Sequence, residues 1–129
     1  VAISKNTDLA KVFDIKEIYF DLNKSDIRPD AAVELAKIVE VMKEYPKMKI
    51  DIRSHTDSRA SDAYNLALSD RRAKSTLEWI VKQGIERKRL TAKGYGETRL
   101  VNGCSNGVPC TEEEHQANRR SEFIIVSME

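Results

Sequence analysis

The feature that most constrains the fold is a change of hydrophobic period across Pro46. Between Ala32 and Tyr45 the apolar side chains recur at the spacing of one helix face, at positions 32, 35, 36, 38, 39, 42 and 45. Between Met48 and Ile52 apolar and charged residues alternate, which is the period of a strand with one solvated face. Because a residue that precedes proline is pushed out of the α region, the helix is expected to end there. The sequence therefore predicts a helix followed at once by a strand.

The same periodicities place further strands on either side of this unit. Residues 18–22 alternate, which predicts a strand before the first helix, and Pro29 favours a helix start at that point. Residues 90–93 predict a short strand. Residues 121–127 are apolar on both faces, which predicts a central strand at the end of the chain.

Two helix-start signals lie between the second and third predicted strands. Ser61 or Asp62 can cap a short helical turn. Ser69-Asp70 is typical of a second start, from which a long helix is expected to run to Gly84. We therefore expect a bend between the two signals. The whole pattern predicts an α+β fold, β-α-β-α-β-β, with one mixed sheet and two main helices packed on one face.

Length and composition indicate one folded domain. The chain has 129 residues and a formal net charge of +1, which suits a single core and argues against a nucleic-acid partner. Residues 1–11 are polar and small with no clear period, so we expect a linker remnant over residues 1–14 and a domain spanning residues 15–129. No apolar run approaches the roughly 18–20 residues that cross a bilayer, and the chain does not begin with Met. We therefore expect a piece of a larger protein whose membrane anchor lies elsewhere.

The two cysteines, Cys104 and Cys110, lie close together in a loop rich in Gly and Asn. A short-range pair in a loop favours a disulfide and an oxidising compartment, although two separate thiols are the alternative. His55 and His115 could join the cysteines in a zinc set, but the spacing Cys-x5-Cys-x4-His matches no standard close pair. We therefore expect no metal and no other cofactor.

Motifs for covalent or nucleotide chemistry are missing from the sequence. No Gly-x-Ser-x-Gly elbow is present, and no Ser or Cys lies in a recognisable nucleophile motif with a His base. Gly94-Tyr95-Gly96 lacks the third glycine and the strand-to-helix setting of a dinucleotide loop, so we interpret it as a turn. The sequence favours a binding module, and no enzyme activity is expected.

Two charged residues stand out between the second predicted strand and the long helix. Asp57 directly follows a strand end, where loops collect ligand-binding groups. Arg72 falls in the first turn expected for the long helix, where a cation is disfavoured unless an anion lies beside it. A guanidinium can hold a carboxylate with two hydrogen bonds. The pair predicts a site for a ligand with an ammonium and a carboxylate on one carbon, although either residue alone could be a solvated surface charge.

Five motifs occur in an order that resembles one known family. They are Tyr19-Phe20-Asp21-Leu22-Asn23-Lys24-Ser25-Asp26-Ile27, His55-Thr56-Asp57, Tyr64-Asn65-x-x-Leu68-Ser69-x-x-Arg72-Ala73, Gly94-Tyr95-Gly96-Glu97 and Asn118-Arg119-Arg120. From about Ile15 to the C-terminus the chain resembles the OmpA-like peptidoglycan-binding domain, the family of OmpA, Pal and MotB. The cysteine loop and the segment from Thr111 to His115 resemble the outer-membrane versions of Bacteroidetes-type bacteria.

The resemblance implies non-covalent binding of peptidoglycan through the diaminopimelate of its stem peptide, whose free end carries an ammonium and a carboxylate. The family residues that hold these two groups map to Asp57 and Arg72. Further contacts with the ligand map to Asn23, Thr56, Asn65, Leu68 and Arg120. The resemblance also implies a periplasmic domain that tethers its parent protein, attached to the outer membrane, to the cell wall.

One position departs from the family pattern. Members usually carry Gly a few residues after the motif Asp, where this chain has Ala60. If the position needs a positive φ, Ala costs about 1 kcal/mol or reshapes the loop. This departure leaves an alternative, in which wall binding is weakened or lost and the module serves as a structural or dimerisation domain.

Overall fold

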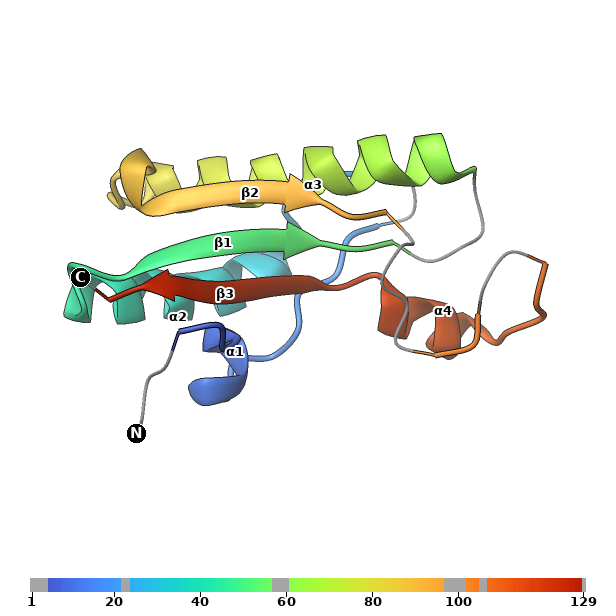
Figure 1. Ribbon diagram of the computed structural model, residues 1–129, viewed down its shortest axis with the longest axis horizontal. Coiled ribbons are helices and arrows are strands. Elements are labelled where there is room, and N and C mark those ends of the chain that lie inside the picture. Colours follow the sequence, from blue (N-terminus) through green and yellow to red (C-terminus); the bar gives the residue numbers. More distant parts are fainter. Residues whose placement is uncertain (1–4, 22–23, 57–60, 97–101, 105–106, 129) are drawn as a thin grey trace.

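The structure, a computed structural model of the chain, describes residues 5–21, 24–56, 61–96, 102–104 and 107–128. Its elements in chain order are α1 (Leu9–Val12), α2 (Pro29–Glu44), β1 (Lys49–Ser54), α3 (Asp62–Lys82), the 3₁₀ helix η1 (Arg87–Arg89), β2 (Leu90–Gly94), α4 (Glu112–Asn118) and β3 (Ser121–Ser127). In Figure 1 the sheet lies in front of α2 and α3, and α4 lies beside the end at which β3 begins. Within the described ranges, no helix is both long and apolar enough to cross a membrane.

The sheet has three strands in the order β2-β1-β3. β1 pairs with β2 in parallel and with β3 antiparallel, so Ile52 lies opposite both Ala92 and Phe123. The parallel pair is joined by α3, and both main helices cover the same face of the sheet (Figure 1). The predicted α+β fold, with a mixed sheet and two main helices on one face, is therefore confirmed.

The hydrophobic core lies between that face and the two helices. Ile50 and Ile52 of β1 are fully buried, whereas the side chains between them lie on the more exposed face, as the period of two requires. Pro29 occupies the first turn of α2, where its missing N–H removes no hydrogen bond. The buried stripe of α2 that meets the sheet includes Ala31, Leu35, Ile38, Val39 and Met42.

The predicted first strand is not present among the residues that the structure describes. Residues 18–21 have no strand pairing, although Ile18 and Phe20 are buried as the alternation predicted. The outer edge of β3 is instead taken by residues 6–8. The N–H of Asn6 donates to the carbonyl of Ile125 at 2.7 Å, and the N–H of Ile125 donates to the carbonyl of Thr7 at 2.9 Å.

The stretch expected to be a linker remnant packs against β3. Leu9 of α1 is fully buried, and the carboxylate of Asp8 accepts hydrogen bonds from the N–H groups of Ala10 and Phe123, both at 3.1 Å. This packing also explains why β3 is apolar on both faces. β3 is not central, because β1 holds that place, and Ile124 is buried where Asp8 forms a β-bridge with it.

α3 is one continuous helix, so the predicted bend is wrong. Ser61 caps it, accepting a hydrogen bond from the N–H of Tyr64 at 3.2 Å, and Gly84 follows its end with a φ of +104°. Ser69 does not start a second helix. Its hydroxyl donates to the carbonyl of Leu66 at 2.9 Å, inside the helix.

Candidate ligand-binding site

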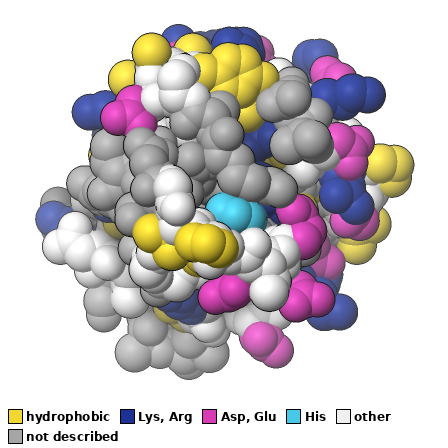
Figure 2. Space-filling model, turned by 90° about the vertical axis from the view of Figure 1, so that its right-hand side faces the viewer, with side chains coloured by type: hydrophobic (Ala, Val, Ile, Leu, Met, Phe, Trp, Pro, Cys, Tyr) yellow, Lys and Arg dark blue, Asp and Glu magenta, His cyan; other side chains and the backbone are white. Residues whose placement is uncertain are grey.

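Three segments meet at the end of the sheet where β1 and β2 finish. Thr56 follows β1, Gly96 follows β2, and Arg120 precedes β3. The N–H of Thr56 donates to the carbonyl of Gly96 at 2.9 Å, and the N–H of His55 donates to the carbonyl of Arg120 at 2.8 Å. Figure 2 looks onto this end of the molecule, where acidic and basic side chains lie interspersed. Backbone hydrogen bonds thus hold together three segments that are distant in the sequence.

Two glycines let β2 approach α3 closely at this end. A Cβ atom on Gly94 would lie 2.2 Å from the backbone nitrogen of Asp70, closer than real atoms come. Gly96 has a φ of +57°, and its N–H donates to the hydroxyl of Ser69 at 2.8 Å. The interpretation as a turn missed this role, although two glycines at a strand end were the available signal.

Arg72 is fully buried, with 1% of its surface exposed. Its Nε donates to the carbonyl of Lys24 at 2.8 Å, and its Nη2 donates to the carbonyl of Asp21 at 3.0 Å. The guanidinium carbon lies 5.0 Å from the ring centroid of Phe20. These contacts fix the plane of the guanidinium, and a fixed plane favours recognition of a carboxylate by two parallel hydrogen bonds.

The position of Arg72 within its helix differs from the prediction. It is the eleventh residue of α3, so it does not lie in the first turn, and the argument from the helix dipole does not apply. The charge is accommodated by two backbone carbonyls and an aromatic ring from the segment before α2. Their contribution could not be anticipated from the helix itself.

The structure describes five of the seven predicted ligand-binding residues: Thr56, Asn65, Leu68, Arg72 and Arg120. Asn65, Leu68 and Arg72 share one buried face of α3 at spacings of three and four. A Cβ atom on Gly96 would lie 3.4 Å from the carbonyl carbon of Asn65, so this face touches the strand end.

The remaining two predicted residues, Asp57 and Asn23, lie outside the described residues, as does Ala60. The proposed opposition of Asp57 and Arg72 therefore stays a prediction.

Buried polar atoms without hydrogen-bond partners gather at the same strand ends. Within the part of the chain that the structure describes, the hydroxyls of Ser54, Thr56 and Ser121 are shielded from solvent and unpaired. Ser54 and Ser121 lie opposite one another across β1 and β3. Since buried polar groups are normally paired, this cluster indicates a place where a ligand or ordered water supplies the missing partners. Neither serine was predicted as a site residue from the sequence, although a serine at an inward strand position was a signal.

His55, which directly follows β1, contacts both of the neighbouring chain segments at this strand end. Its Nε2 lies 2.6 Å from Oε1 of Glu122, and its ring stacks on Tyr95 with the ring centroids 5.5 Å apart. The hydrogen bond from His55 holds the pKa of Glu122 below its usual value, against the opposing effect of burial. His55 therefore connects β1, β3 and the segment after β2 next to Thr56.

Glu17 lies behind the junction between Arg120 and β3. Its Oε1 accepts a hydrogen bond from the N–H of Ser121 at 2.8 Å. Burial raises the pKa of Glu17 to about 7; the Asp8 carboxylate adds to the rise, while the Ser121 N–H and Arg120 oppose it. This carboxyl group thus changes charge near neutral pH, next to a residue of the site.

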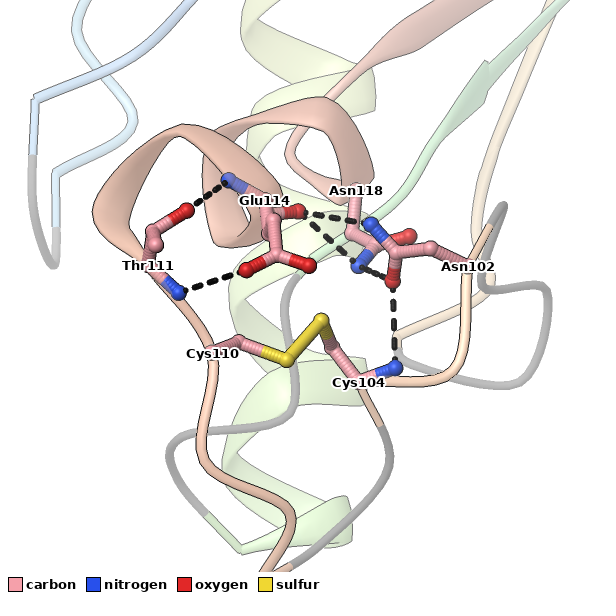
Figure 3. The surroundings of a disulfide bond; sticks show 6 residues. All are labelled: Asn102, Cys104, Cys110, Thr111, Glu114 and Asn118. Atoms are coloured by element: carbon pink, nitrogen blue, oxygen red, sulfur yellow. Dashed lines mark hydrogen bonds between the residues drawn. A yellow bond between two sulfur atoms is a disulfide. The ribbon is translucent and has the colours of Figure 1, made fainter.

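A disulfide braces the segment that leads to Arg120. Cys104 and Cys110 are joined, as predicted, so their sulfurs are bonded to one another and are not zinc ligands. Figure 3 shows the bond beside the start of α4, where Thr111 and Glu114 cap the helix reciprocally. The N–H of Thr111 donates to Glu114 Oε1 at 2.9 Å, and the N–H of Glu114 donates to Thr111 Oγ1 at 3.2 Å.

Two asparagines tie the cysteine loop to the end of α4 (Figure 3). Asn118 is fully buried, and its Nδ2 donates to Oδ1 of Asn102 at 2.9 Å. The same oxygen accepts from the N–H of Cys104 at 3.1 Å. Because Asn118 ends α4 two residues before Arg120, this network fixes where the chain enters the site.

Comparisons with known proteins agree on one family. The OmpA family model matches residues 19–118. The chain is 38% identical over 109 residues to outer membrane porin F of Pseudomonas fluorescens, covering 84% of this chain and 32% of the porin. It is 39% identical over 87 residues to the peptidoglycan-associated lipoprotein of Brucella melitensis, covering 67% of this chain and 52% of the lipoprotein.

The similar region is a module found in larger proteins. It also matches, at 42% identity, 13% of the length of the photosystem I P700 chlorophyll a apoprotein A2 of Gloeobacter violaceus. The chain therefore spans about half, or less, of the length of these relatives. The resemblance of the cysteine loop to the outer-membrane versions of Bacteroidetes-type bacteria stays a prediction.

The fold agrees with a solved structure as well. The crystal structure of the peptidoglycan-associated lipoprotein from Burkholderia pseudomallei superposes with a TM-score of 0.75 at 24% identity, covering 85% of this chain and 89% of that one. Together with the family model, which covers most of the described residues, these similarities identify the chain as a member of the OmpA family.

Proposed function

We propose that this domain binds peptidoglycan non-covalently and anchors an outer-membrane protein to the cell wall. The proposal is supported by the family and by relatives whose names place them in the outer membrane or with peptidoglycan. The parent protein would supply the attachment to the outer membrane, because the chain spans only part of these relatives. A disulfide suits a domain that works in the oxidising periplasm.

The ligand group that fits best is the diaminopimelate of the stem peptide. The observation that carries this proposal is the buried, immobilised guanidinium of Arg72, on the helix that packs against a strand end with unpaired buried hydroxyls. Arg72 would hold the free carboxylate and Asp57 the ammonium. The other predicted contacts would line the pocket around them: Asn23, Thr56, Asn65, Leu68 and Arg120.

We propose a binding role without a reaction. A hydroxyl nucleophile needs a base within hydrogen-bond reach. The hydroxyls of Ser54, Thr56 and Ser121 make no hydrogen bond to any such base among the described residues. They are suited to accept or donate hydrogen bonds to a bound group.

Calorimetric titration with a soluble disaccharide-peptide that contains diaminopimelate tests the site. Wild type should bind it, while Arg72→Lys and Asp57→Asn should each lose about 10- to 100-fold in affinity, because each loses a charge-assisted hydrogen bond. Circular dichroism would show whether both variants remain folded.

The matched control is on the ligand side, so it does not depend on the stability of a variant. A stem peptide with lysine in place of diaminopimelate lacks the extra carboxylate and should bind wild type about 10- to 100-fold more weakly. Equal affinity for the two peptides would contradict the assignment. No binding of either, together with dimerisation in sedimentation, would favour the structural alternative.

A further inference from the structure

The outer edge of β3 is held by carboxylates where the strand begins. The N–H of Ser121 donates to Oε1 of Glu17 at 2.8 Å, and the N–H of Phe123 donates to Oδ1 of Asp8 at 3.1 Å. Further along, the N–H of Ile125 donates to a backbone carbonyl of the N-terminal segment at 2.9 Å. The start of this edge is therefore bonded to side chains whose charge depends on pH, whereas a backbone carbonyl does not respond to pH.

Glu17 is joined to the candidate site through Ser121. Arg120 immediately precedes Ser121, and its carbonyl accepts a hydrogen bond from the N–H of His55 at 2.8 Å. Burial raises the pKa of Glu17 to about 7, and the positive charge of Arg120 opposes this rise. An ionised Glu17 in turn attracts the guanidinium of Arg120. One of the residues predicted to contact the ligand is therefore sensitive to the charge of Glu17.

The carboxyl group of Glu17 is accessible to solvent protons. The residue is half-buried and lines a hollow of about 610 Å³ beside the first turns of α2, together with Tyr19 and Val33. A proton can therefore exchange at Glu17 without opening the strand ends. Because its pKa lies close to neutral pH, small changes in the pH of the surroundings alter its charge.

Three elements supply the charged groups around Glu17. Asp8, before α1, and Glu122, in β3, repel its negative charge, while Arg120 attracts it. Glu122 is itself bonded to His55 at 2.6 Å. Further charged side chains line the hollow: Lys16, Asp30 and Glu34. The two acidic members of this set are each paired with a basic side chain at 3.0 Å. Arg120 is therefore the group of the site on which a change in the charge of Glu17 acts.

Arg120 can offer a ligand hydrogen-bond donors and no acceptor, because it carries a guanidinium. Its partner on a stem peptide must be an oxygen atom, and a carboxylate makes the strongest bond of this kind. An ionised Glu17 competes with such a carboxylate for the charge of Arg120 and also repels it. A protonated Glu17 is neutral and does neither.

We propose that Glu17 is a positioning residue of the ligand site and that its ionised form weakens the hold of Arg120 on an acidic group of the wall peptide. This proposal rests on the proposed function, because it needs the stem peptide to contact Arg120. By linkage, a ligand that occupies Arg120 raises the affinity of Glu17 for its proton by the same factor. Wall binding therefore takes up protons near neutral pH and weakens as the pH rises.

Calorimetric titration of the intact domain measures both sides of this linkage. The disaccharide-peptide that contains diaminopimelate would be titrated between about pH 5.5 and 8, at each pH in two buffers of different ionisation enthalpy. Wild type should bind about fivefold more weakly at the alkaline end, which is the low end of usual coupling because Glu17 is only half-buried. Near neutral pH, a fraction of a proton should be taken up with each ligand bound.

Glu17→Gln should show neither the slope nor the proton uptake. Its affinity should match that of wild type at the acidic end, because the amide is neutral and keeps an oxygen for the Ser121 N–H. Glu40→Gln, exposed on α2, is the matched control and should keep the wild-type slope. The proton uptake of wild type needs no variant, so the test does not depend on how well Glu17→Gln folds.

The possible results separate this proposal from the proposed function. If wild type binds with one affinity across the range and takes up no proton, the proposal is overturned while the proposed function stands. A slope that Glu17→Gln keeps in full would assign it to another group, such as His55, and would overturn the proposal as well. An affinity that falls equally at every pH in Glu17→Gln would show a structural role alone, with the same consequence. If wild type binds at no pH, the proposed function fails and this proposal with it.

Discussion

The two ends of the sheet bury polar groups in different ways. At the end where β1 and β2 begin, the guanidinium of Arg89 is buried against backbone carbonyls. Its Nε donates to Met48 at 2.9 Å, and its Nη2 donates to Met42 at 2.7 Å and to Tyr45 at 2.8 Å. Because Met42 and Tyr45 close α2, Arg89 satisfies carbonyls that a helix end leaves open.

At the end where β1 and β2 finish, several buried polar groups have no hydrogen-bond partner among the described residues. Arg72 is held by two carbonyls in a similar manner, yet the hydroxyls at the nearby strand ends remain unpaired among the described residues. A buried arginine alone therefore does not identify a binding site. The unsatisfied polar groups around the strand ends make the difference, because unpaired buried groups cost stability unless a ligand or water meets them.

We call the end where β1 and β2 finish, with its unpaired hydroxyls, the polar end. The substitution expected to disrupt it most is one that separates β2 from α3. Gly94→Ala would place a Cβ atom 2.2 Å from the backbone nitrogen of Asp70, so strand and helix must move apart. We expect a loss of about 3–4 kcal/mol of unfolding free energy in urea, with loss of peptide binding. Gly103→Ala is the control, since a Cβ atom there meets nothing within 4 Å. A Gly94→Ala protein with wild-type stability would contradict the close approach.

Arg89 tests whether the opposite end is purely structural. Arg89→Met should cost about 2–3 kcal/mol in urea unfolding, because the carbonyls of Met42 and Met48 lose a buried donor. The folded fraction should bind the diaminopimelate peptide with unchanged affinity. A fall in that affinity comparable to the one expected for Arg72→Lys would remove the distinction between the two ends.

The disulfide tests how firmly the site segment must be held. Replacing Cys104 and Cys110 by serine opens a loop with a sequence separation of 6, which should cost about 2 kcal/mol in chain entropy. Urea unfolding of wild type with a reductant should give the same loss. Peptide affinity should fall less than in Arg72→Lys, because Asn102 and Asn118 still tie the loop to α4. An unchanged midpoint after complete reduction would show that the bond does not stabilise the domain.

Elements that depend on local patterns could be predicted from the sequence. The stripe from Ala32 to Tyr45 and the stop at Pro46 predicted α2 and the start of β1, because helix and strand periods are properties of neighbouring residues. The pairing of Cys104 with Cys110, at a sequence separation of 6, was likewise a short-range signal.

Features that depend on distant partners could not be predicted. Residues 18–22 have the alternation of a strand, but the edge of β3 is taken by residues 6–8, which have no pattern of their own. Ser69 was mistaken for a helix start. Its hydroxyl instead accepts a hydrogen bond from the N–H of Gly96, 27 residues away, and the local sequence does not reveal that partner. Arg72 was expected in the first turn of a helix, which was wrong, and its burial deep in α3 was not predicted; its role in holding a carboxylate stays a prediction.

The smallest expected effect concerns Glu17, the carboxyl group behind the polar end. Its pKa is raised from 4.5 to about 7, chiefly by burial, so the folded state binds its proton more tightly than the unfolded chain does. Between about pH 4.5 and 7 the folded state holds more protons, and stability must therefore fall as pH rises through that window. Glu17 is only half-buried, so solvent screening limits the effect to about 1 kcal/mol.

Glu17→Gln should remove this loss, because the amide keeps an oxygen for the Ser121 N–H without becoming charged. In urea unfolding from pH 4.5 to 8, the variant should match wild type at the acidic end and exceed its stability at pH 8. Glu40→Gln, exposed on α2, should leave the wild-type profile unchanged. If the Glu17→Gln profile kept the full wild-type slope, the pH dependence would come from other groups. The polar end would then differ from the Arg89 end in its unpaired hydroxyls alone.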